Sequence, residues 1–233
     1  MRWQRYAYQS IDWVAGLAKL GEIRRAAVSL FAERGFAATG IRDVGRAAGL
    51  NSATLYHYAS GKEELLAGIM RAGLGELLRT GREAVSYRAD PAVQLARLVA
   101  AHVANEAVNP LTSRVTDTEV RALTGRNRAE IIALRDEYEA LVAGVLARGV
   151  ATGEFHVTDL GVARLALVEM CNGVALWYRP DGRLSVAELQ DRFVELAGRL
   201  AGSRAVRRDE YGPPITPLRL DSEPHHTREL TDR

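Results

Sequence analysis

The side chains best placed for chemistry lie between residues 39 and 62, where small polar residues alternate with a few cations. On a helix that turns Leu55 inward, Ser52, Ala53 and His57 would point outward. Short polar side chains on such a face could contact base edges in a DNA groove. Residues 1–79 carry eleven basic and seven acidic residues, whereas the rest of the chain carries 20 basic and 22 acidic ones. A basic N-terminal third on a mildly acidic body is compatible with binding a polyanion.

The sequence does not indicate catalysis. It contains no glycine-rich phosphate loop after a strand, no H-E-x-x-H and no G-x-S-x-G motif. His57, His102 and His156 are far apart, so they do not have the spacing of metal ligands. Cys171 is the single cysteine, which excludes a disulfide framework, and its apolar surroundings favour a buried side chain over a nucleophile. We therefore expect no enzyme, no metal and no cofactor.

The same features favour a cytoplasmic location. One cysteine fits a reducing compartment. No apolar stretch of about 18 residues is free of charge, so no membrane span is expected. The first twenty residues contain Asp12 and lack a continuous apolar region, so a signal peptide is not expected either.

The elements that must position these side chains are all helices. Apolar residues recur at spacings of three and four, as at Ile131, Leu134, Tyr138, Leu141 and Val145, and strand-like alternation is absent. None of the seven prolines interrupts such a segment. The fold class is therefore all-α. The predicted helices span residues 21–34, 40–47, 51–58, 61–80, 91–109, 113–124, 127–149, 158–179 and 186–201.

Two short helices with a tight turn between them are predicted over residues 40–58. Val44 would face inward on the first helix and Leu55 on the second. Gly49 suits the turn because glycine adopts positive φ without strain, and Asn51 would cap the second helix. Two such helices form a helix-turn-helix, whose second helix fits a major groove of DNA.

This segment resembles the DNA-binding domain of the TetR (tetracycline-repressor) family of bacterial regulators. The resemblance implies that Tyr56 and Lys62 contact DNA phosphates, for which a phenol and a cation are suited. Gly45 and Ala59 depart from the family, which usually has Ala and Phe there. The matching motifs are A-x-x-L-F-A-E-R-G-F at 27–36, Thr39, D-V at 43–44, A-x-x-A-G-L at 45–50 read loosely, T-L-Y at 54–56 and K-E-E-L-L at 62–66. The candidate contacts to double-stranded operator DNA, an inverted repeat, are Thr39, Arg42, Asn51, Ser52, Ala53, Thr54, Tyr56, His57 and Lys62.

Helix starts and composition divide the chain further. Asp90 followed by Pro91 is typical of a helix start, and Ser60 and Ser185 each stand three residues before a glutamate, as in a capping box. The end of the chain holds four of the seven prolines, which favours disorder. We expect an N-terminal extension over 1–20, the helix-turn-helix domain over 21–66, a ligand-binding and dimerisation domain over 67–201 and a disordered tail over 202–233.

The last two predicted helices are candidates for a dimer interface. Residues 158–179 are apolar nearly all round, so they should be covered on more than one side. Residues 186–200 carry an apolar stripe at helical spacing. Two such helices from each of two subunits would make a four-helix interface, as is common in the TetR family, but the stripes could also pack within one subunit. The interface candidates are Val186, Leu189, Phe193 and Leu196.

The body also resembles a TetR subgroup that includes acyl-CoA-sensing regulators of fatty-acid and steroid catabolism. The motifs are E-V-R-A-L at 119–123, R-D-E-Y at 135–138, G-E-F at 153–155 and N-G-V-A-L-W-Y-R-P at 172–180, with Ser185 after them. Polar residues within the apolar segment 158–179 would suit a pocket, although internal hydrogen bonding explains them equally well. The candidate ligand-binding residues are Leu98, His102, Arg135, Tyr138, Glu169, Asn172 and Trp177, with Arg121, Arg126 and Arg128 as further partners for phosphates.

We therefore predict a homodimeric repressor of lipid, steroid or fatty-acid catabolism that an acyl-CoA-type ligand releases from its operator. One alternative is a TetR-type repressor of an efflux pump that answers to a hydrophobic drug, with Glu169 facing a cationic ligand. Another class remains open, an all-α small-molecule binding protein without DNA binding. The small polar side chains flanked by Arg42 and Lys62 favour the regulator.

Overall fold

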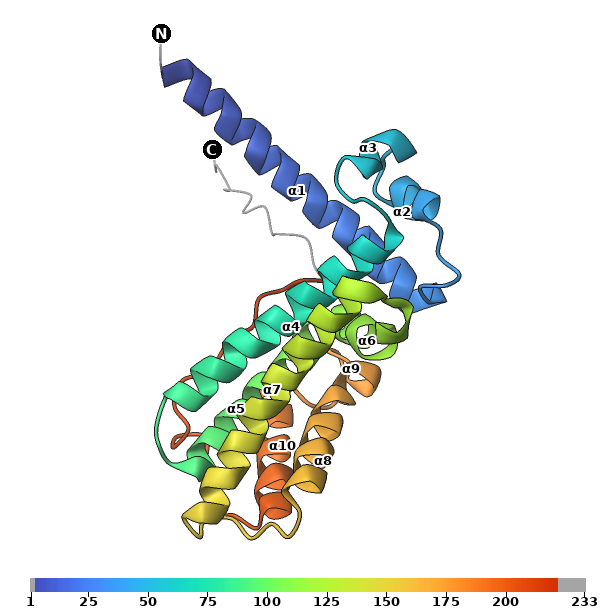
Figure 1. Ribbon diagram of the computed structural model, residues 1–233. Helices are drawn as coiled ribbons and strands as arrows, with labels where there is room; N and C mark the ends of the chain where they lie inside the picture. The colour runs from blue at the N-terminus through green and yellow to red at the C-terminus, as the bar shows by residue number, and fades with distance from the viewer. Residues whose placement is uncertain (1–2, 222–233) are drawn as a thin grey trace.

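The computed structural model describes residues 3–221, and within this range every element of secondary structure is a helix (Figure 1). Side chains are described except in residues 3–15 and at Leu17 and Ser52. The elements are α1 (Trp3–Arg34), α2 (Ile41–Ala47), α3 (Ser52–Tyr56), α4 (Lys62–Ser86), α5 (Pro91–Val108), α6 (Pro110–Thr118), the 3-10 turn η1 (Val120–Ala122), α7 (Gly125–Ala151), α8 (Leu160–Asn172), α9 (Val174–Trp177) and α10 (Val186–Ala201).

The helices form two parts, as Figure 1 shows. At one end α1 leans away from the bundle, with α2 and α3 beside it. At the other end α5 lies in the middle of a body made with α4, α7, α8 and α10. Helix α4 belongs to both parts, because Leu66 near its start packs with α1 and Leu78 farther along packs with α5.

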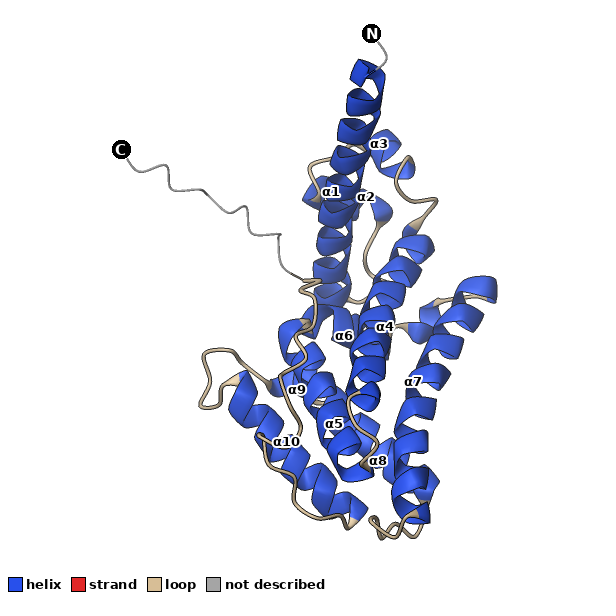
Figure 2. Ribbon diagram, turned by 90° about the vertical axis from the view of Figure 1, so that its left-hand side faces the viewer, coloured by secondary structure: helices blue, strands red, loops and turns tan. Residues whose placement is uncertain are grey.

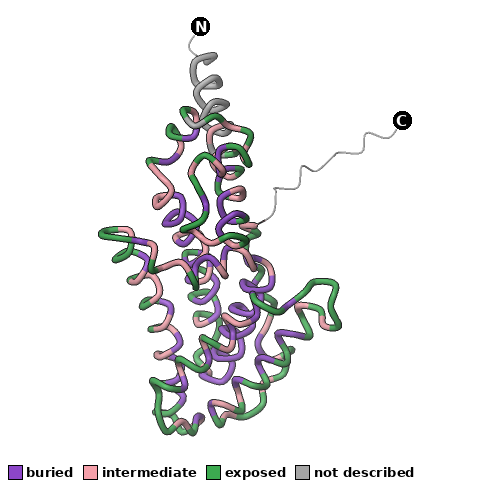
Figure 3. Tube along the Cα trace, turned by 90° about the vertical axis from the view of Figure 1, so that its right-hand side faces the viewer, coloured by how far each residue is buried: buried purple, intermediate pink, exposed green. Residues whose placement is uncertain are grey.

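Each part has its own apolar core. In the first, Ile23, Phe31, Val44 and Leu55 are almost completely buried, and residues of α6, η1 and α7 complete the cluster. In the second, nearly every residue of α5 is buried, in agreement with the interior position of this helix in Figure 3. Burying one such aliphatic side chain contributes about 1.5–3 kcal/mol to the free energy of folding. The apolar contacts of each core therefore stabilise the packing of its helices.

Two of the three predicted helix starts are confirmed. The Asp90 carboxylate accepts a hydrogen bond from the Val93 amide at 3.0 Å. Ser185 and Glu188 form a reciprocal capping box at the start of α10. The expected box at Ser60 is wrong, because Gly61 is the N-cap of α4 and no side chain caps it.

Several helix bounds differ from those predicted. Helix α1 begins at Trp3, so residues 3–20 continue the first helix instead of forming a separate segment. Helix α4 continues to Ser86, because the segment beyond residue 80 is also amphipathic and packs on the body. The predicted helix 113–124 is split into α6 and η1, and Gly173 separates α8 from α9 within the predicted helix 158–179.

The expectation of a disordered tail is wrong for residues 203–221, which we call the strap. Figure 2 shows the strap running from the end of α10 along the body towards α1. Tyr211 and Ile215 are buried against the body, and the Asn109 side-chain amide donates to the Leu218 carbonyl at 2.7 Å. The strap packs on the body because apolar residues that alternate with its prolines are buried there. Its backbone also forms hydrogen bonds with side chains of α4, of α5 and of the junction between α5 and α6. Residues 222–233 of the predicted tail lie outside the described part of the chain.

Candidate DNA-binding surface and ligand site

The turn between α2 and α3 is built as the sequence predicts. Gly49 has a φ of 65°, and the Leu50 amide donates to the Gly45 carbonyl at 2.8 Å. A Cβ on Gly45 would stand 3.2 Å from the Leu50 carbonyl oxygen, so the absence of a side chain keeps this turn tight. The Asn51 carboxamide oxygen caps α3 by accepting from the Thr54 amide at 2.8 Å. Local contacts therefore fix the angle at which α3 is presented.

Five candidate DNA contacts are exposed on this unit, namely Arg42, Asn51, Ala53, Tyr56 and His57. Tyr56 is 53% exposed, although it lies next to the fully buried Leu55. A large aromatic residue left in water on a short helix is available for contact with a partner. The Ser52 side chain lies outside the described residues.

Other candidates have structural roles that the sequence did not reveal. Thr39 is buried, and its hydroxyl donates to the Gly35 carbonyl at 2.9 Å, so it closes the end of α1 and does not face DNA. The Lys62 ammonium donates to the Phe36 carbonyl at 2.7 Å and lies 4.0 Å from the centroid of the Phe36 ring. The Thr54 hydroxyl is bonded to Asn51. These three side chains therefore stabilise the conformation of the DNA-binding unit through internal hydrogen bonds.

In the body, four candidate ligand residues come together. Leu98, His102 and Tyr138 are almost completely buried, and the Tyr138 hydroxyl lies 3.0 Å from His102 Nδ1. On the other side of the ring, His102 Nε2 lies 3.0 Å from the Asn172 carboxamide oxygen. Since that oxygen can only accept, Nε2 carries the proton and Nδ1 accepts from the phenol. Burial lowers the pKa of His102 from 6.5 to about 4, which keeps the imidazole neutral.

A polar cavity of about 30 Å³ adjoins this cluster, between α4, α5 and α6. Glu106 and Thr116 line it, and both are at least 95% buried, yet Glu106 Oε2 and the Thr116 hydroxyl have no hydrogen-bond partner. Burial raises the pKa of Glu106 well above 4.5, and the nearby charge of Asp117 raises it further. Buried polar atoms without partners are costly in free energy, so they mark a place where a ligand or water can be held. Neither residue is among the predicted ligand contacts, although a glutamate within an otherwise apolar helix indicates such a site.

The other three candidate ligand residues do not face this cavity. Glu169 and Trp177 are exposed on the outside of α8 and α9, and Trp177 stacks on Phe193 with ring centroids 6.2 Å apart. Arg135 donates to the Thr116 carbonyl and faces Asp117 at 3.5 Å, so its guanidinium is already bound. A helix that is apolar nearly all round gives no signal for which side faces inward, which is why Glu169 and Trp177 were misplaced.

The proposed phosphate partners on α7 and η1 lie away from this cavity. Arg121, Arg126 and Arg128 are exposed, and none of them lines the polar cavity beside Glu106. These arginines lie on η1 and the first turn of α7, which face solvent. Their closeness in sequence to the motif at 119–123 therefore does not bring them to the interior.

The predicted dimer contacts divide between core and surface. Leu189 and Phe193 are 1% and 7% exposed, and both belong to the apolar core of the body within the same subunit. Val186 is partly buried against the same core. Leu196 points the other way and is 46% exposed. It is accompanied by further exposed apolar side chains on α8 and α9, namely Val162, Leu165, Leu176 and Trp177, which we call the α8–α10 face.

The stretch Leu160–Trp177 is also apolar enough, by length and composition, to cross a membrane, with a mean hydropathy of 1.4. It contains two charged residues, and one of them, Arg164, forms an ion pair with Glu139 of α7 at 3.2 Å. The stretch packs against α5 and α7, so it belongs to the protein body.

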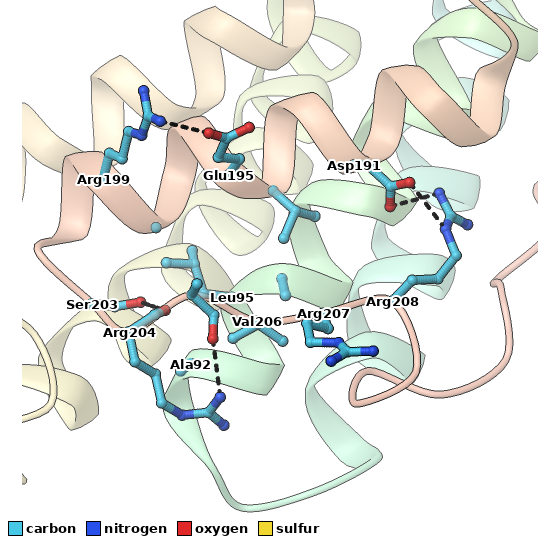
Figure 4. A pocket seen from close by; sticks show the side chains of 14 residues that line it. Ala92, Leu95, Asp191, Glu195, Arg199, Ser203, Arg204, Val206, Arg207 and Arg208 are labelled. Carbon is cyan, nitrogen blue, oxygen red and sulfur yellow. Dashed lines mark hydrogen bonds and ion pairs between the residues drawn. The ribbon is translucent and has the colours of Figure 1, made fainter.

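A further cavity, of about 420 Å³, is an open groove between α5, α10 and the strap (Figure 4). Its floor is apolar, with Leu95 and Val206, and its rim carries several arginines. These arginines are neutralised: Arg199 lies 2.6 Å from Glu195, and Arg208 lies 2.8 Å from Asp191, as Figure 4 shows. Because the arginines on the rim are paired with carboxylates, the groove offers little excess attraction for an anion.

Comparison with known proteins decides the family. Residues 23–69 match the family described as "Bacterial regulatory proteins, tetR family", and residues 88–201 match "Tetracyclin repressor-like, C-terminal domain". The HTH-type transcriptional repressor KstR2 of Rhodococcus jostii is 33% identical over 179 residues, which cover 75% of this chain and 87% of that protein. The chain belongs to the TetR family of transcriptional regulators. It is accordingly a DNA-binding regulator of the repressor type and not an enzyme, and the predicted all-α fold with an N-terminal helix-turn-helix is confirmed.

Two solved TetR-family structures share this architecture. The ketosteroid transcriptional regulator KstR2 of Mycobacterium tuberculosis has a TM-score of 0.72 at 26% identity, over 78% of this chain and 93% of that one. AibR in complex with isovaleryl coenzyme A and operator DNA has a TM-score of 0.70 at 24% identity, over 80% of this chain and 100% of that one. The second likeness shows the fold alone. The matched C-terminal family segment ends at residue 201, before the strap.

Proposed function

We propose that this chain is a homodimeric cytoplasmic repressor of lipid, steroid or fatty-acid breakdown, and that an acyl-CoA-type ligand releases it from an inverted-repeat operator. The observation that carries the proposal is the unsatisfied polar cavity beside His102, which adjoins α6. Helix α6 contacts α1 of the DNA-binding part, so a ligand at this cavity would act on a helix that connects the two functions.

The contacts of α6 supply a route for this coupling. Arg114 donates to the Ala32 carbonyl at the end of α1 at 3.2 Å. Glu119, directly after α6, accepts from the Phe36 amide at 3.0 Å. Phe36 is also the residue that holds Lys62. A small displacement of α6 would therefore shift the end of α1 and the turn that leads to α2, and a coupling free energy of about 1–3 kcal/mol is typical of such regulation.

Helix α4 provides the second route. A Cβ on Gly73 would stand 2.8 Å from Thr112 Cγ2, so α4 and α6 approach closely at this glycine. Gly75 has open space around its missing Cβ. A displacement of α6 would therefore be passed to α4 at Gly73, which also lines the cavity.

The nature of the ligand is supported by the relatives and by the cavity. KstR2 is described as a ketosteroid regulator, and AibR was solved with isovaleryl coenzyme A. The unpartnered Thr116 hydroxyl can donate a hydrogen bond, and burial favours the protonated, donating form of Glu106, which suits the carbonyl of a thioester or a ring ketone. The efflux alternative loses its main support, because Glu169 faces solvent and not the cavity.

A second copy of the chain would cover the α8–α10 face. Val162 and Leu176 are 63% and 62% exposed, and Leu165, Trp177 and Leu196 are about half exposed. Contiguous exposed apolar residues of this size mark protein interfaces. The dimer also suits DNA, because α3 is short and one copy offers few base contacts.

The test combines DNA release with direct binding. A gel shift at low salt with the chain's own promoter region should show a retarded complex that weakens steeply as salt is raised, because phosphate contacts release counterions. Acetyl-, isovaleryl-, octanoyl- and palmitoyl-CoA are then added, with free CoA and the free acids as controls. We expect one thioester to bind with micromolar or tighter affinity, about −8 kcal/mol or better, and to abolish the retarded band. If cationic hydrophobic drugs alone abolish it, the ligand is of the efflux class.

A further inference from the structure

Three arginines from distant parts of the sequence surround one groove of about 230 Å³. The groove lies between α1, α4, the start of α6 and the strap, and Arg24, Arg25 and Arg219 line it together with Thr112 and Leu220. Arg24 and Arg219 are separated by nearly the whole chain and meet here because the strap returns to α1, as Figure 2 shows. The groove therefore belongs to the junction between the DNA-binding part and the body.

The groove has an excess of positive charge. Arg24, Arg25 and Arg219 form no ion pair and no hydrogen bond with other described residues, in contrast to the neutralised arginines of the larger groove in Figure 4. The nearby carboxylates are engaged elsewhere: Glu22 lies 2.6 Å from the Lys19 ammonium, and Asp221 accepts from the Thr112 hydroxyl at 2.6 Å. Free guanidinium groups that converge on one groove are suited to phosphate oxygens.

The groove shares a wall with the polar cavity of the body. Thr112 and Leu220 line both spaces, so these two side chains separate the arginines from Glu106 and Thr116. The cavity holds about 30 Å³, which is too small for an acyl group of several carbons. Leu220 belongs to the strap, whose last described contacts are hydrogen bonds from the Leu111 and Thr112 amides to Asp221. Movement of the strap would open the wall and enlarge the cavity.

We propose that Arg24, Arg25 and Arg219 bind the phosphate groups of a phosphorylated thioester, whose acyl arm passes Leu220 and Thr112 into the polar cavity. This inference rests on the proposed function and specifies its phosphate subsite. The arginines replace the exposed Arg121, Arg126 and Arg128 in that role. Because Arg24 and Arg25 lie on α1 and Arg219 lies on the strap, the bound phosphates bridge the DNA-binding part and the body.

The test separates phosphate from acyl recognition. Calorimetry compares isovaleryl- and octanoyl-CoA with the isovaleryl and octanoyl thioesters of N-acetylcysteamine, which have the same thioester but no phosphate. The variants are Arg219→Gln and the double variant Arg24→Gln/Arg219→Gln. The matched control is Arg207→Gln, since Arg207 is an exposed strap arginine on the other groove. Circular dichroism melting checks that each variant is folded.

We expect the double variant to lose at least tenfold in affinity for the CoA thioesters and to bind the N-acetylcysteamine thioesters as the wild type does. The Arg219→Gln variant should lose less, and Arg207→Gln should lose nothing. Unchanged affinity of the folded double variant for a CoA thioester that the wild type binds would overturn the phosphate subsite and leave the proposed function intact. If the wild type binds neither form of thioester, the proposed function fails and the subsite fails with it.

Discussion

Acidification should destabilise this protein through one buried histidine. His102 is 2% exposed, and both of its ring nitrogens are occupied in the neutral form, one by the Tyr138 phenol and the other by Asn172. Its pKa is lowered to about 4, whereas the unfolded chain has the ordinary value of 6.5. Between these values the unfolded state binds the proton and the folded state does not. The contribution to stability is therefore complete above pH 6.5 and is lost as the pH falls towards 4.

The size of this effect follows from the two pKa values. A tenfold change in proton affinity corresponds to about 1.4 kcal/mol, so the free energy of unfolding should fall by about 2.5 kcal/mol between pH 7.5 and pH 4.5 because of His102 alone. Glu106 acts in the opposite direction, because its raised pKa makes the folded state bind a proton more readily than the unfolded one. Other carboxyl groups also titrate in this range. A comparison with a variant that lacks the imidazole isolates the histidine.

The assay is urea unfolding at fixed protein concentration at pH 7.5, 6.0 and 4.5. His102→Gln keeps a polar, non-titrating side chain and should show a pH dependence that is shallower than that of the wild type by about 2.5 kcal/mol over this range. His156→Gln is the matched control, since His156 is exposed. It should follow the wild type. Parallel curves for His102→Gln and the wild type would refute the reasoning, as would an NMR titration of His102 with a midpoint near 6.5.

Four further predictions concern packing and exposed side chains. Leu189→Ala should lower the stability of each subunit by about 2–5 kcal/mol in urea unfolding, because Leu189 is 1% exposed, and sedimentation of the folded fraction should still show dimer. Leu165→Glu, on the exposed face, should instead leave the folded monomer intact and abolish the dimer in sedimentation; a dimer that persists would place the interface elsewhere. Gly149→Ala should cost about 1–3 kcal/mol, because an added Cβ would overlap the ring of Phe155, and an unchanged melting temperature would contradict this contact. Tyr56→Phe should weaken binding to all DNA sequences alike in gel shifts, since a phosphate contact carries no base preference, and a changed sequence preference would argue for base readout.

The DNA-binding unit was largely predictable because its signals are local. Gly49 takes the positive φ that the turn requires, Asn51 caps the next helix, and Leu55 is fully buried beneath exposed neighbours. Each of these features depends on residues within one or two turns of chain. The sequence did not reveal the internal partners of Thr39 and Lys62, whose side chains donate to the carbonyls of Gly35 and Phe36.

The ligand site was only partly predictable. The periodicity placed Leu98, His102 and Tyr138 on inward faces, and the structure brings His102 and Tyr138 into contact. Glu169 and Trp177 were placed wrongly because a helix that is apolar nearly all round has no preferred face in its sequence.

The sequence by itself determined the all-helical class, the caps of α3, α5 and α10, the helix-turn-helix and the family, because hydrophobic periodicity, capping and turn formation act over a few residues. Only the tertiary structure decided what each apolar face is buried against. Leu189 lies in the core and Leu196 at the surface, although both belong to one stripe of α10. The tertiary structure alone also places Arg219 of the strap and Arg24 of α1 on the same groove. Such contacts depend on the path of the whole chain, because a stripe specifies that a face is covered and not which segment covers it.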